Sequence, residues 1–417
     1  MARLPPPLSM LAGLATGRDE SLFAGDIEAH APRIHECVAG RRILVVGGAG
    51  SVGSATTLEL LRYGPRALAV LDPNENGLAE LVRTVRSSAS DAVAAAELDV
   101  SPLDYGSPLA ERFLAERGPF DVVLIFAALK HVRSERDSLS VLRLLEVNLL
   151  AADRFLHCLR KGGHGQRGVF LISTDKAARP VSVMGASKRA VESLLWTHTE
   201  QRTADAPPPL PLAMSARFAN VAFSQGSLTW SFLERLAKRQ PLAAPGDVRR
   251  YLLTPEEAAQ LCLLAVSCCP HRHLLIPKLS AAELVDFPHV ARVTLEAYGL
   301  QAVLVRDEAT ARHRVGVELA RGRYPLLVTR TTTPGEKVIE EFAGPTEKAV
   351  DIGLEKAHAL AARPGDPRAL EALLQRVRSG CKDAYSDVRR ERLVELLGKL
   401  IADFDHRDAE EHLDQKL

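Results

Sequence analysis

The stretch "RILVVGGAGSVGS", residues 42–54, decides the fold. An apolar run leads directly into three glycines spaced G-x-x-G-x-x-G, and a helical pattern follows them. Glycine is required there because the turn is tight, the backbone must approach a pyrophosphate, and the helix N-terminus must face that anion without an intervening side chain. The stretch therefore predicts a dinucleotide-binding strand, loop and helix. The residues expected to contact the cofactor here are Gly47, Gly50, Ser51, Val52 and Gly53.

An acidic residue closes the next apolar run, "ALAVLD" at 67–72. Asp72 stands where an acid binds the hydroxyls of the adenosine ribose. Its carboxylate would repel a 2′-phosphate, and no arginine follows it in "LDPNENG", so the sequence favours NAD over NADP. Asp99 and Val100, at the end of the third apolar run, are candidates for contact with the adenine, although an Asp in this place is more often a turn former.

Short apolar runs recur along the first half of the chain. Runs of this length and composition make buried parallel strands. Helical stretches separate them, and this alternation predicts an α/β fold built on a Rossmann-type doubly wound parallel sheet. The expected strands are residues 42–48, 67–72, 94–100, 120–128, 168–174 and 212–220.

Changes in composition divide the chain into four parts. Residues 1–40 form an N-terminal extension with a Pro-rich start and a weakly amphipathic segment that predicts a short helix. Residues 41–225 are expected to form the NAD-binding Rossmann domain. Residues 226–345 mix helical and strand patterns, which predicts a smaller substrate-binding part with strands that return to the sheet. Residues 346–417 are rich in Ala, Leu, Glu and Arg and predict a helical C-terminal tail.

Overall composition excludes several classes of function. The 417 residues include 53 basic and 52 acidic side chains, so no large single-sign field favours nucleic acid or an anionic membrane as a partner. The N-terminal apolar patch is interrupted by prolines and is too short for a membrane span or a signal peptide. Six cysteines include no CxxC pair and no Cys/His ligand spacing. We therefore expect reduced thiols, no metal site and a cytoplasmic protein.

Further motifs stand on both sides of the glycine loop. They are "GRDE" (17–20), "AALKHV" (127–132), Asn148, "STDKAARPVSVMGASKRAVE" (173–192), "RFANVAFSQGS" (217–227), "DVRRYLLTPEEAAQL" (247–261), "IPKLS" (276–280) and "PGEKVIEE" (334–341). In this order they resemble the motifs of the nucleotide-sugar 4,6-dehydratases, members of the extended short-chain dehydrogenase superfamily that make precursors of bacterial surface polysaccharides and glycans. The resemblance covers residues 17–348 and implies a nucleotide-sugar substrate.

Met184 stands where short-chain dehydrogenases usually carry a catalytic tyrosine, four residues ahead of Lys188. A thioether has no proton to give or take. Within the family that the chain resembles, small soluble members usually keep the tyrosine, whereas large membrane-anchored members carry methionine. The sequence looks like the soluble portion of the large type, so Met184 does not itself exclude catalysis.

The resemblance implies a reaction in which NAD takes a hydride from C4 of the sugar, water leaves from C5 and C6, and the hydride returns to C6. It assigns the base at C5 to Lys176, the acid at O6 to Asp175, a hydrogen bond to the C4 oxygen to Thr174, and the nicotinamide ribose to Lys188. A lysine acts as a base only when neutral, which burial and a nearby positive nicotinamide would favour. Two candidates remain for removing the O4 proton: Asp175, or a water held by Lys188.

The resemblance also implies a nucleotide-sugar site. The chain departs from the family at Ile125, Phe126, Ala219 and Thr333, which leaves open whether its sugar or nucleotide differs from UDP-N-acetylglucosamine. The implied contacts are Ala127 with the cofactor and Lys130, Asn220, Ser227, Arg250, Tyr251 and Glu336 with the substrate.

Three functions stay open from the sequence. The first is a 4,6-dehydratase, and the second is an epimerase or oxidoreductase acting on a nucleotide sugar. The third is a catalytically silent NAD-binding or scaffold protein, suggested by Met184, Thr333 and the long tail. We also expect a homo-oligomer, because short-chain dehydrogenases commonly pair through helices beside the sheet and the tail at 346–417 offers further surface for a neighbour.

Overall fold

The computed structural model describes residues 4–87, 96–130, 135, 137–201, 206–331, 337–383 and 388–406. Within these residues the largest element is a nine-stranded sheet of order β14-β15-β10-β6-β5-β4-β1-β2-β3. Seven of these strands run parallel, namely β3, β2, β1, β4, β5, β6 and β10. Strands β15 and β14 are added antiparallel at one edge. This order confirms the predicted doubly wound Rossmann sheet. The strands are β1 (Arg42–Val46), β2 (Ala67–Leu71), β3 (Glu97–Ser101), β4 (Val122–Ile125), β5 (Gly168–Thr174), β6 (Ala213–Phe218), β10 (His273–Pro277), β14 (Ala349–Val350) and β15 (Ala357–Ala361).

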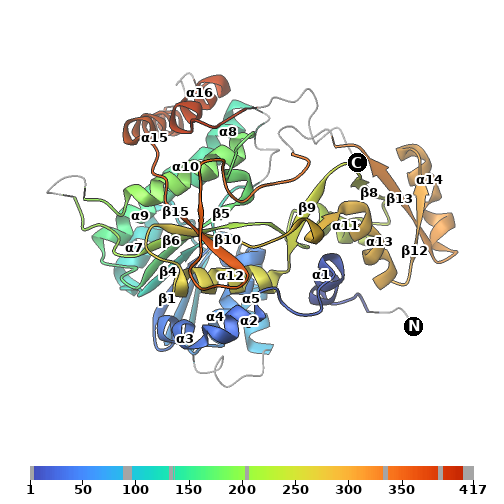
Figure 1. Ribbon diagram of the computed structural model, residues 1–417, viewed down its shortest axis with the longest axis horizontal. Coiled ribbons are helices and arrows are strands. Elements are labelled where there is room, and N and C mark those ends of the chain that lie inside the picture. The colour runs from blue at the N-terminus through green and yellow to red at the C-terminus, as the bar shows by residue number, and fades with distance from the viewer. Residues whose placement is uncertain are drawn as a thin grey trace.

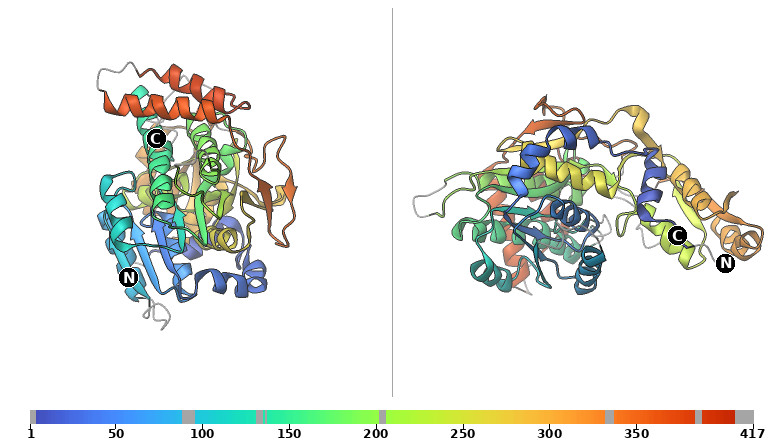
Figure 2. Two further views of the ribbon diagram at one scale, coloured as in Figure 1. Left: turned by 90° about the vertical axis from the view of Figure 1, so that its left-hand side faces the viewer. Right: turned by 90° about the horizontal axis from the view of Figure 1, so that it is seen from below.

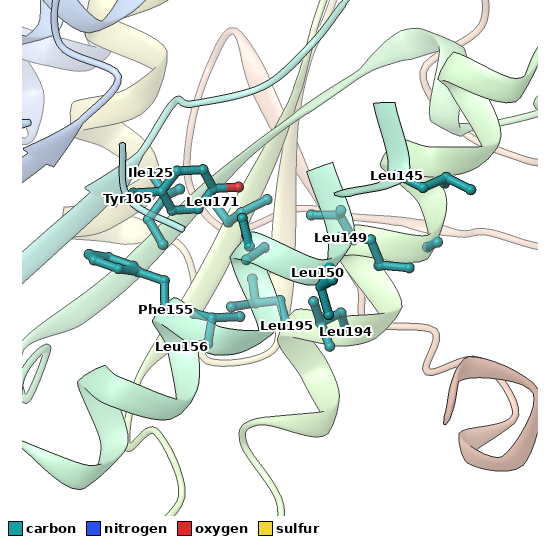
Figure 3. Packing of buried hydrophobic residues seen from close by; sticks show 14 of the residues in the cluster. Tyr105, Ile125, Leu145, Leu149, Leu150, Phe155, Leu156, Leu171, Leu194 and Leu195 are labelled. Atoms are coloured by element: carbon teal, nitrogen blue, oxygen red, sulfur yellow. The ribbon is translucent and has the colours of Figure 1, made fainter. Parts of the chain in front are cut away.

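The central strands are apolar throughout because helices cover both faces of the sheet. In β1, Ile43 and Val45 point into one hydrophobic core, whereas Leu44 and Val46 point into the other. This alternation follows from the two-residue period of a strand. Figure 3 shows the second core, where leucines of the helices lie against Ile125 and other strand side chains.

The helices form two layers, one on each face of the main sheet. One layer holds α3 (Ala31–Val38), α4 (Ser51–Leu61), α5 (Glu75–Ser87) and α12 (Pro255–Cys268). The other layer holds α7 (Pro108–Arg117), α8 (Ser138–Leu145), the π-helix η2 (Glu146–Leu150), α9 (Ala151–Lys161) and α10 (Val183–Thr197). Across the described chain, we find no helix with the length and apolar character that crossing a membrane requires.

A smaller part lies beside the main sheet and has its own core (Figure 1). Two three-stranded sheets form it, of order β11-β9-β7 and β12-β13-β8, together with the helices that pack on them. The strands are β7 (Asn220–Val221), β8 (Leu242–Pro245), β9 (Arg249–Leu253), β11 (Leu284–Asp286), β12 (Gln301–Val305) and β13 (Arg323–Thr329), and the helices are α11 (Leu228–Ala237), α13 (Phe287–Ala297) and α14 (Glu308–Leu319). Short 3₁₀ turns are η3 (Asp175–Ala177) and η4 (Ala281–Glu283).

The N-terminal extension contains more helix than its sequence predicts. Helix α1 (Leu8–Thr16) packs on α13 of the smaller part, and the expected single helix is split into α2 (Ala24–Ala29) and α3. The split occurs where Pro32 stands in the first turn of α3, because proline cannot continue the preceding helix.

The segment predicted as a helical tail begins instead with two strands. Strand β15 pairs with β10, with Ala357 opposite Pro277, and β14 pairs with β15, so Ala349–Val350 and Ala357–Ala361 belong to the sheet and not to a helix. After them, α15 (Pro367–Lys382) and α16 (Arg390–Leu400) form a hairpin that packs on α8 and α10 of the same chain (Figures 1 and 2). The apolar faces of this α15–α16 hairpin join the core of that layer.

Candidate active site

A cavity of about 380 Å³ opens between the main sheet and the smaller part. It lies at the carboxyl ends of β1, β4, β5 and β6, where doubly wound sheets bind ligands. Apolar side chains of Phe218, Leu252 and Phe287 form part of its wall. The predicted site residues that line it are Gly47, Gly50, Ser51, Val52, Gly53, Lys130, Thr174, Lys176, Met184, Lys188, Asn220 and Ser227.

The glycine loop leaves no room for side chains. Gly47 has a φ of 80°, and a Cβ added to it would lie 2.5 Å from the backbone nitrogen of Ala127. A Cβ on Gly53 would lie 2.3 Å from the carbonyl oxygen of Gly47. Helix α4 starts at this loop with Gly50 as its N-cap, so its first N–H groups face the cavity free of a capping side chain. The residues therefore fit a pyrophosphate.

Asp72 supports this loop from behind. It is buried, and its carboxylate oxygens accept hydrogen bonds from the N–H groups of Ala49, at 3.0 Å, and Asn74, at 2.9 Å. Each oxygen keeps a second lone pair, which a ribose hydroxyl can use. Asp99 lies within β3, where its carboxylate is 3.8 Å from Arg117, and Val100 packs on the core. The adenine contact of Asp99 and Val100 stays a prediction.

Thr174, Asp175 and Lys176 follow one another where β5 ends and η3 begins. Asp175 is only 2% exposed and does not line the cavity with its two neighbours. Its Oδ1 accepts three hydrogen bonds, from the Thr174 hydroxyl at 2.7 Å, the Lys176 backbone N–H at 2.9 Å and the Lys176 ammonium at 3.1 Å. Asp175 therefore orients the two side chains that reach the cavity.

Lys176 is surrounded by acceptors. Its Nζ donates to Asp175 and to Oδ1 of Asn220, at 3.2 Å, and lies 3.8 Å from Oε1 of Glu340. Burial lowers the pKa of Lys176, but the carboxylates of Asp175 and Glu340 outweigh burial and raise this pKa above its usual value. Burial therefore acts toward the neutral lysine, as expected, but in these surroundings the two carboxylates act more strongly in the opposite direction. Asn220, predicted to bind substrate, also holds this ammonium in place.

Met184 and Lys188 share one face of α10 because their spacing equals about one helical turn. Helix α10 begins after Ser182, whose hydroxyl accepts the N–H of Gly185. Lys188 is buried and donates to the carbonyl of Ile172 at 3.2 Å. Burial lowers the pKa of Lys188 to about 8, although Glu192 acts in the opposite direction. Lys188 thus presents a cation with an unusually labile proton to the cavity.

The predicted substrate residues are less uniformly placed. Arg250 is buried beneath the cavity wall, where its guanidinium donates to the carbonyls of Arg249, at 2.8 Å, and Val338, at 3.1 Å. The ring of Tyr251 lies 5.6 Å from that of Phe342. Arg250 and Tyr251 are absent from the described cavity lining. Ser227 caps α11 by accepting the N–H of Trp230. Glu336 and Thr333 lie outside the described residues.

A buried ionic network beneath the cavity was not predicted from the sequence. Arg217, which is fully buried, donates to both carboxylate oxygens of Glu192 at 2.8 Å and to Glu347 at 2.9 Å. Arg189 joins both carboxylates, and the Ser173 hydroxyl donates to Glu192. The motifs contain Arg217 and Glu192, but only the fold shows that they pair. The network connects β6, α10 and the segment that carries Glu347.

The sheet order and the glycine loop at the carboxyl ends of its strands together define a doubly wound Rossmann fold with a nucleotide-type cavity. Residues 43–361 match the family described as polysaccharide biosynthesis protein, and the chain belongs to this family.

Three curated relatives share this sequence pattern. The chain is 29% identical to the uncharacterized membrane protein MJ1061 of Methanocaldococcus jannaschii, over 60% of this chain and 70% of that protein. It is 22% identical to the capsular polysaccharide biosynthesis protein CapD of Staphylococcus aureus, over 79% of this chain but only 49% of CapD. An inverting UDP-N-acetylglucosamine 4,6-dehydratase of Campylobacter jejuni is 23% identical over 60% of this chain and 70% of the dehydratase.

Solved structures show the same fold. Pen from Bacillus thuringiensis matches with a TM-score of 0.62 and 18% identity, over 78% of this chain and 88% of Pen. The UDP-glucose 4-epimerase of Thermus thermophilus, solved with NAD, matches with a TM-score of 0.53 and 22% identity, over 72% of this chain and 90% of the epimerase.

Proposed function

We propose that the protein catalyses the NAD-dependent dehydration of a nucleotide-activated sugar to its 4-keto-6-deoxy form. The substrate is UDP-N-acetylglucosamine or a related UDP-sugar, and the product serves polysaccharide or glycan biosynthesis. The observation that carries the proposal is the placement of Thr174 and Lys176 in one cavity with the glycine loop and Lys188. The name of the Campylobacter relative supports the reaction, and the family supports its setting.

Several residues would hold the cofactor. The first turn of α4 and the glycine loop would bind the pyrophosphate, Asp72 would bind the adenosine ribose, and Lys188 would bind the nicotinamide ribose. When bound, NAD accepts a hydride from C4 of the sugar and returns it to C6. We expect NAD to copurify with the protein, because a cycle that regenerates the cofactor gives no reason for its release.

The remaining steps belong to side chains of this chain. Thr174 would donate a hydrogen bond to the C4 oxygen, and Lys176 would remove the C5 proton once the 4-ketone has acidified it. Asp175, which does not line the cavity, would supply the proton to O6 through the Thr174 hydroxyl as water departs. The 2.7 Å contact between Thr174 and Asp175 favours Asp175 over a water on Lys188 as the acceptor of the O4 proton, relayed by the threonine hydroxyl. Met184 takes no proton in this scheme.

The product mass tests the reaction. Purified protein is incubated with UDP-N-acetylglucosamine, and loss of one water supports dehydration. An unchanged mass with a changed sugar would indicate an epimerase, loss of two hydrogens with NADH an oxidoreductase, and no conversion with bound NAD a silent protein. In deuterated water, solvent deuterium should enter at C5, while the hydride that moves from C4 to C6 stays unlabelled.

Two substitutions test the roles within the site. Lys176→Ala should lower the rate of water loss by about 10²- to 10⁴-fold, the usual cost of removing a positioned base. Met184→Ala should leave a substantial part of the rate, because the thioether handles no proton. Dehydration by Lys176→Ala at close to the parent rate would contradict the mechanism.

A further inference from the structure

Glu340 is a buried carboxyl group beside the proposed base, and the sequence alone gives it no role. It is 4% exposed, and its Oε1 lies 3.8 Å from Nζ of Lys176. Its Oε2 is buried and has no hydrogen-bond partner among the described residues. Lys337, whose Nζ lies 3.8 Å from this Oε2, is likewise without a hydrogen-bond partner there. A buried carboxylate without a hydrogen bond to this oxygen is costly, so its position beside Lys176 calls for an explanation.

The charges around Glu340 come from three directions. Asp175 and Lys176 approach it from the end of β5, Arg250 from β9, and Lys337 from its own segment. The backbone near Glu340 is fixed, because the carbonyl of Val338 accepts hydrogen bonds from Arg250 and from the backbone N–H of Arg249. Further along, the Arg217 network holds Phe342 and Glu347. Glu340 therefore has a defined position relative to Lys176.

We propose that Glu340 is a positioning residue that accepts the ammonium proton of Lys176, so that Lys176 meets the C5 proton as a neutral amine. This inference rests on the proposed dehydration. In the transfer, an N–H bond of the ammonium breaks, an O–H bond forms on the Glu340 carboxyl, and the two opposite charges cancel. The lysine then binds the C5 proton, its ammonium protons exchange with solvent, and it delivers a solvent-derived proton to C5 after the hydride reaches C6; Glu340 finally returns the first proton.

The surroundings of both groups agree with this transfer. The pKa of Lys176 is held above its usual value, so at neutral pH this lysine loses its proton only if a nearby group accepts it. Burial raises the pKa of Glu340, which outweighs the lowering effect of Lys176, so Glu340 accepts a proton more readily than an exposed glutamate. A neutral amine and a neutral acid also suit a site closed by substrate, because neither carries a charge to be solvated.

The pH profile of kcat for Glu340→Gln tests the transfer, with Glu341→Gln as a matched control. Glu341 is the next residue, half-exposed, and its carboxylate lies 3.5 Å from Arg179 at the surface. We expect Glu340→Gln to lose on the order of 10²-fold in kcat at pH 7 with little change in KM. Activity should recover as the pH rises into the alkaline range, where Lys176 can lose its proton to water without Glu340. Glu340→Asp should regain part of the rate, and Glu341→Gln should resemble the parent. A loss that is equal at every pH would overturn the proposal.

A second measurement works without turnover. The Nζ of ¹⁵N-labelled lysine is titrated by NMR in the parent and in Glu340→Gln, with Lys176→Arg used to assign the signal. Removing the neighbouring carboxylate should lower the pKa of Lys176, and an unchanged titration would overturn the inference even in an active dehydratase. If the titrations differ as expected but no sugar nucleotide loses water, the pairing of Glu340 with Lys176 stands and the proposed function fails.

Discussion

Lys188 illustrates how a single residue can serve a site at the expense of the fold. Burial lowers its pKa to about 8, from the 10.5 of an ordinary lysine. The unfolded chain therefore holds this proton more tightly than the folded chain does. By linkage, the charged lysine destabilises the folded state below pH 8, and this penalty disappears as the pH rises from about 8 to 10.5.

Replacing Lys188 with methionine should therefore stabilise the protein while removing its activity. We expect the free energy of unfolding at pH 7 to rise by roughly 1–3 kcal/mol, because an apolar side chain of similar size replaces a buried cation. The gain should shrink at pH 10, where the parent lysine is largely neutral. Chemical denaturation at the two pH values measures this. Lys238→Met, at an exposed ion pair with Glu234, is the control and should change stability by less than about 0.5 kcal/mol. A Lys188→Met protein no more stable than the parent at pH 7 would contradict the linkage.

Local motifs explain which site residues could be predicted from the sequence. Gly47, Lys176 and Lys188 line the cavity as expected, because the spacing within a loop, a strand end and a helix turn sets their geometry directly. Glu340 could not be predicted, since its contact with Lys176 depends on how a distant segment returns to the sheet. The contribution of Glu340 to the pKa of Lys176 could not be predicted for the same reason.

At the scale of the elements, the buried ion pairs of Arg217 connect β6, α10 and the segment around Glu347. Burial would raise the pKa of Glu192, but Arg217 and Arg189 lower it to about 2. The folded-state pKa lies below the ordinary value of 4.5, so the stability from this carboxylate is present above pH 4.5 and is lost as the pH falls toward 2.

Arg217→Met should remove the buried ion pairs of Arg217 with Glu192 and Glu347. It leaves two buried carboxylates with Arg189 as their remaining arginine, so the free energy of unfolding at pH 7 should fall by about 3–5 kcal/mol. Urea denaturation at pH 7 measures the loss. In the control Arg392→Met, an exposed pair with Glu395 is broken, and the loss should stay below about 1 kcal/mol. Equal losses in the two variants would show that the buried network contributes no more than a surface pair.

Most strands of the sheet could be predicted, because buried parallel strands are continuous apolar runs. Strands β14 and β15 could not, since Ala349–Val350 is very short and Ala357–Ala361 is dominated by alanine, which favours helices. Their pairing at the sheet edge overrides that preference. Helix α1 was missed because prolines precede it, although Leu11, Ala12 and Ala15 are buried against the smaller part.

At the scale of the whole molecule, the α15–α16 hairpin covers one of the two helix layers beside the sheet. It covers α8, η2 and α10 with leucines of its own, including Leu373 and Leu397. Homo-oligomerisation stays a prediction, but a second copy that approaches this side meets the hairpin and not α8 and α10.

Loosening the hairpin should expose that apolar layer. Leu397→Asp places a charge at a fully buried position, so we expect the mass measured by light scattering at micromolar concentration to increase. Gly398→Asp is the matched control, because a side chain at Gly398 meets nothing within 4 Å and should leave the mass unchanged. An unchanged mass for Leu397→Asp would show that the hairpin does not shield an associating surface.

The chain passes repeatedly between the two parts of the molecule. Helix α1 belongs to the smaller part, and the next segment builds the main sheet up to β6. Strands β7 to β9 then lie in the smaller part, and α12 and β10 lie in the main part. Strands β11 to β13 lie again in the smaller part, before β14 and β15 complete the edge of the main sheet. Several chain connections therefore link the two parts, and a large opening between the parts would require all of these connections to bend at the same time. The same connectivity constrains recombination between related genes. Because the smaller part is built from several separate segments, a single crossover cannot transfer it intact from one chain to another.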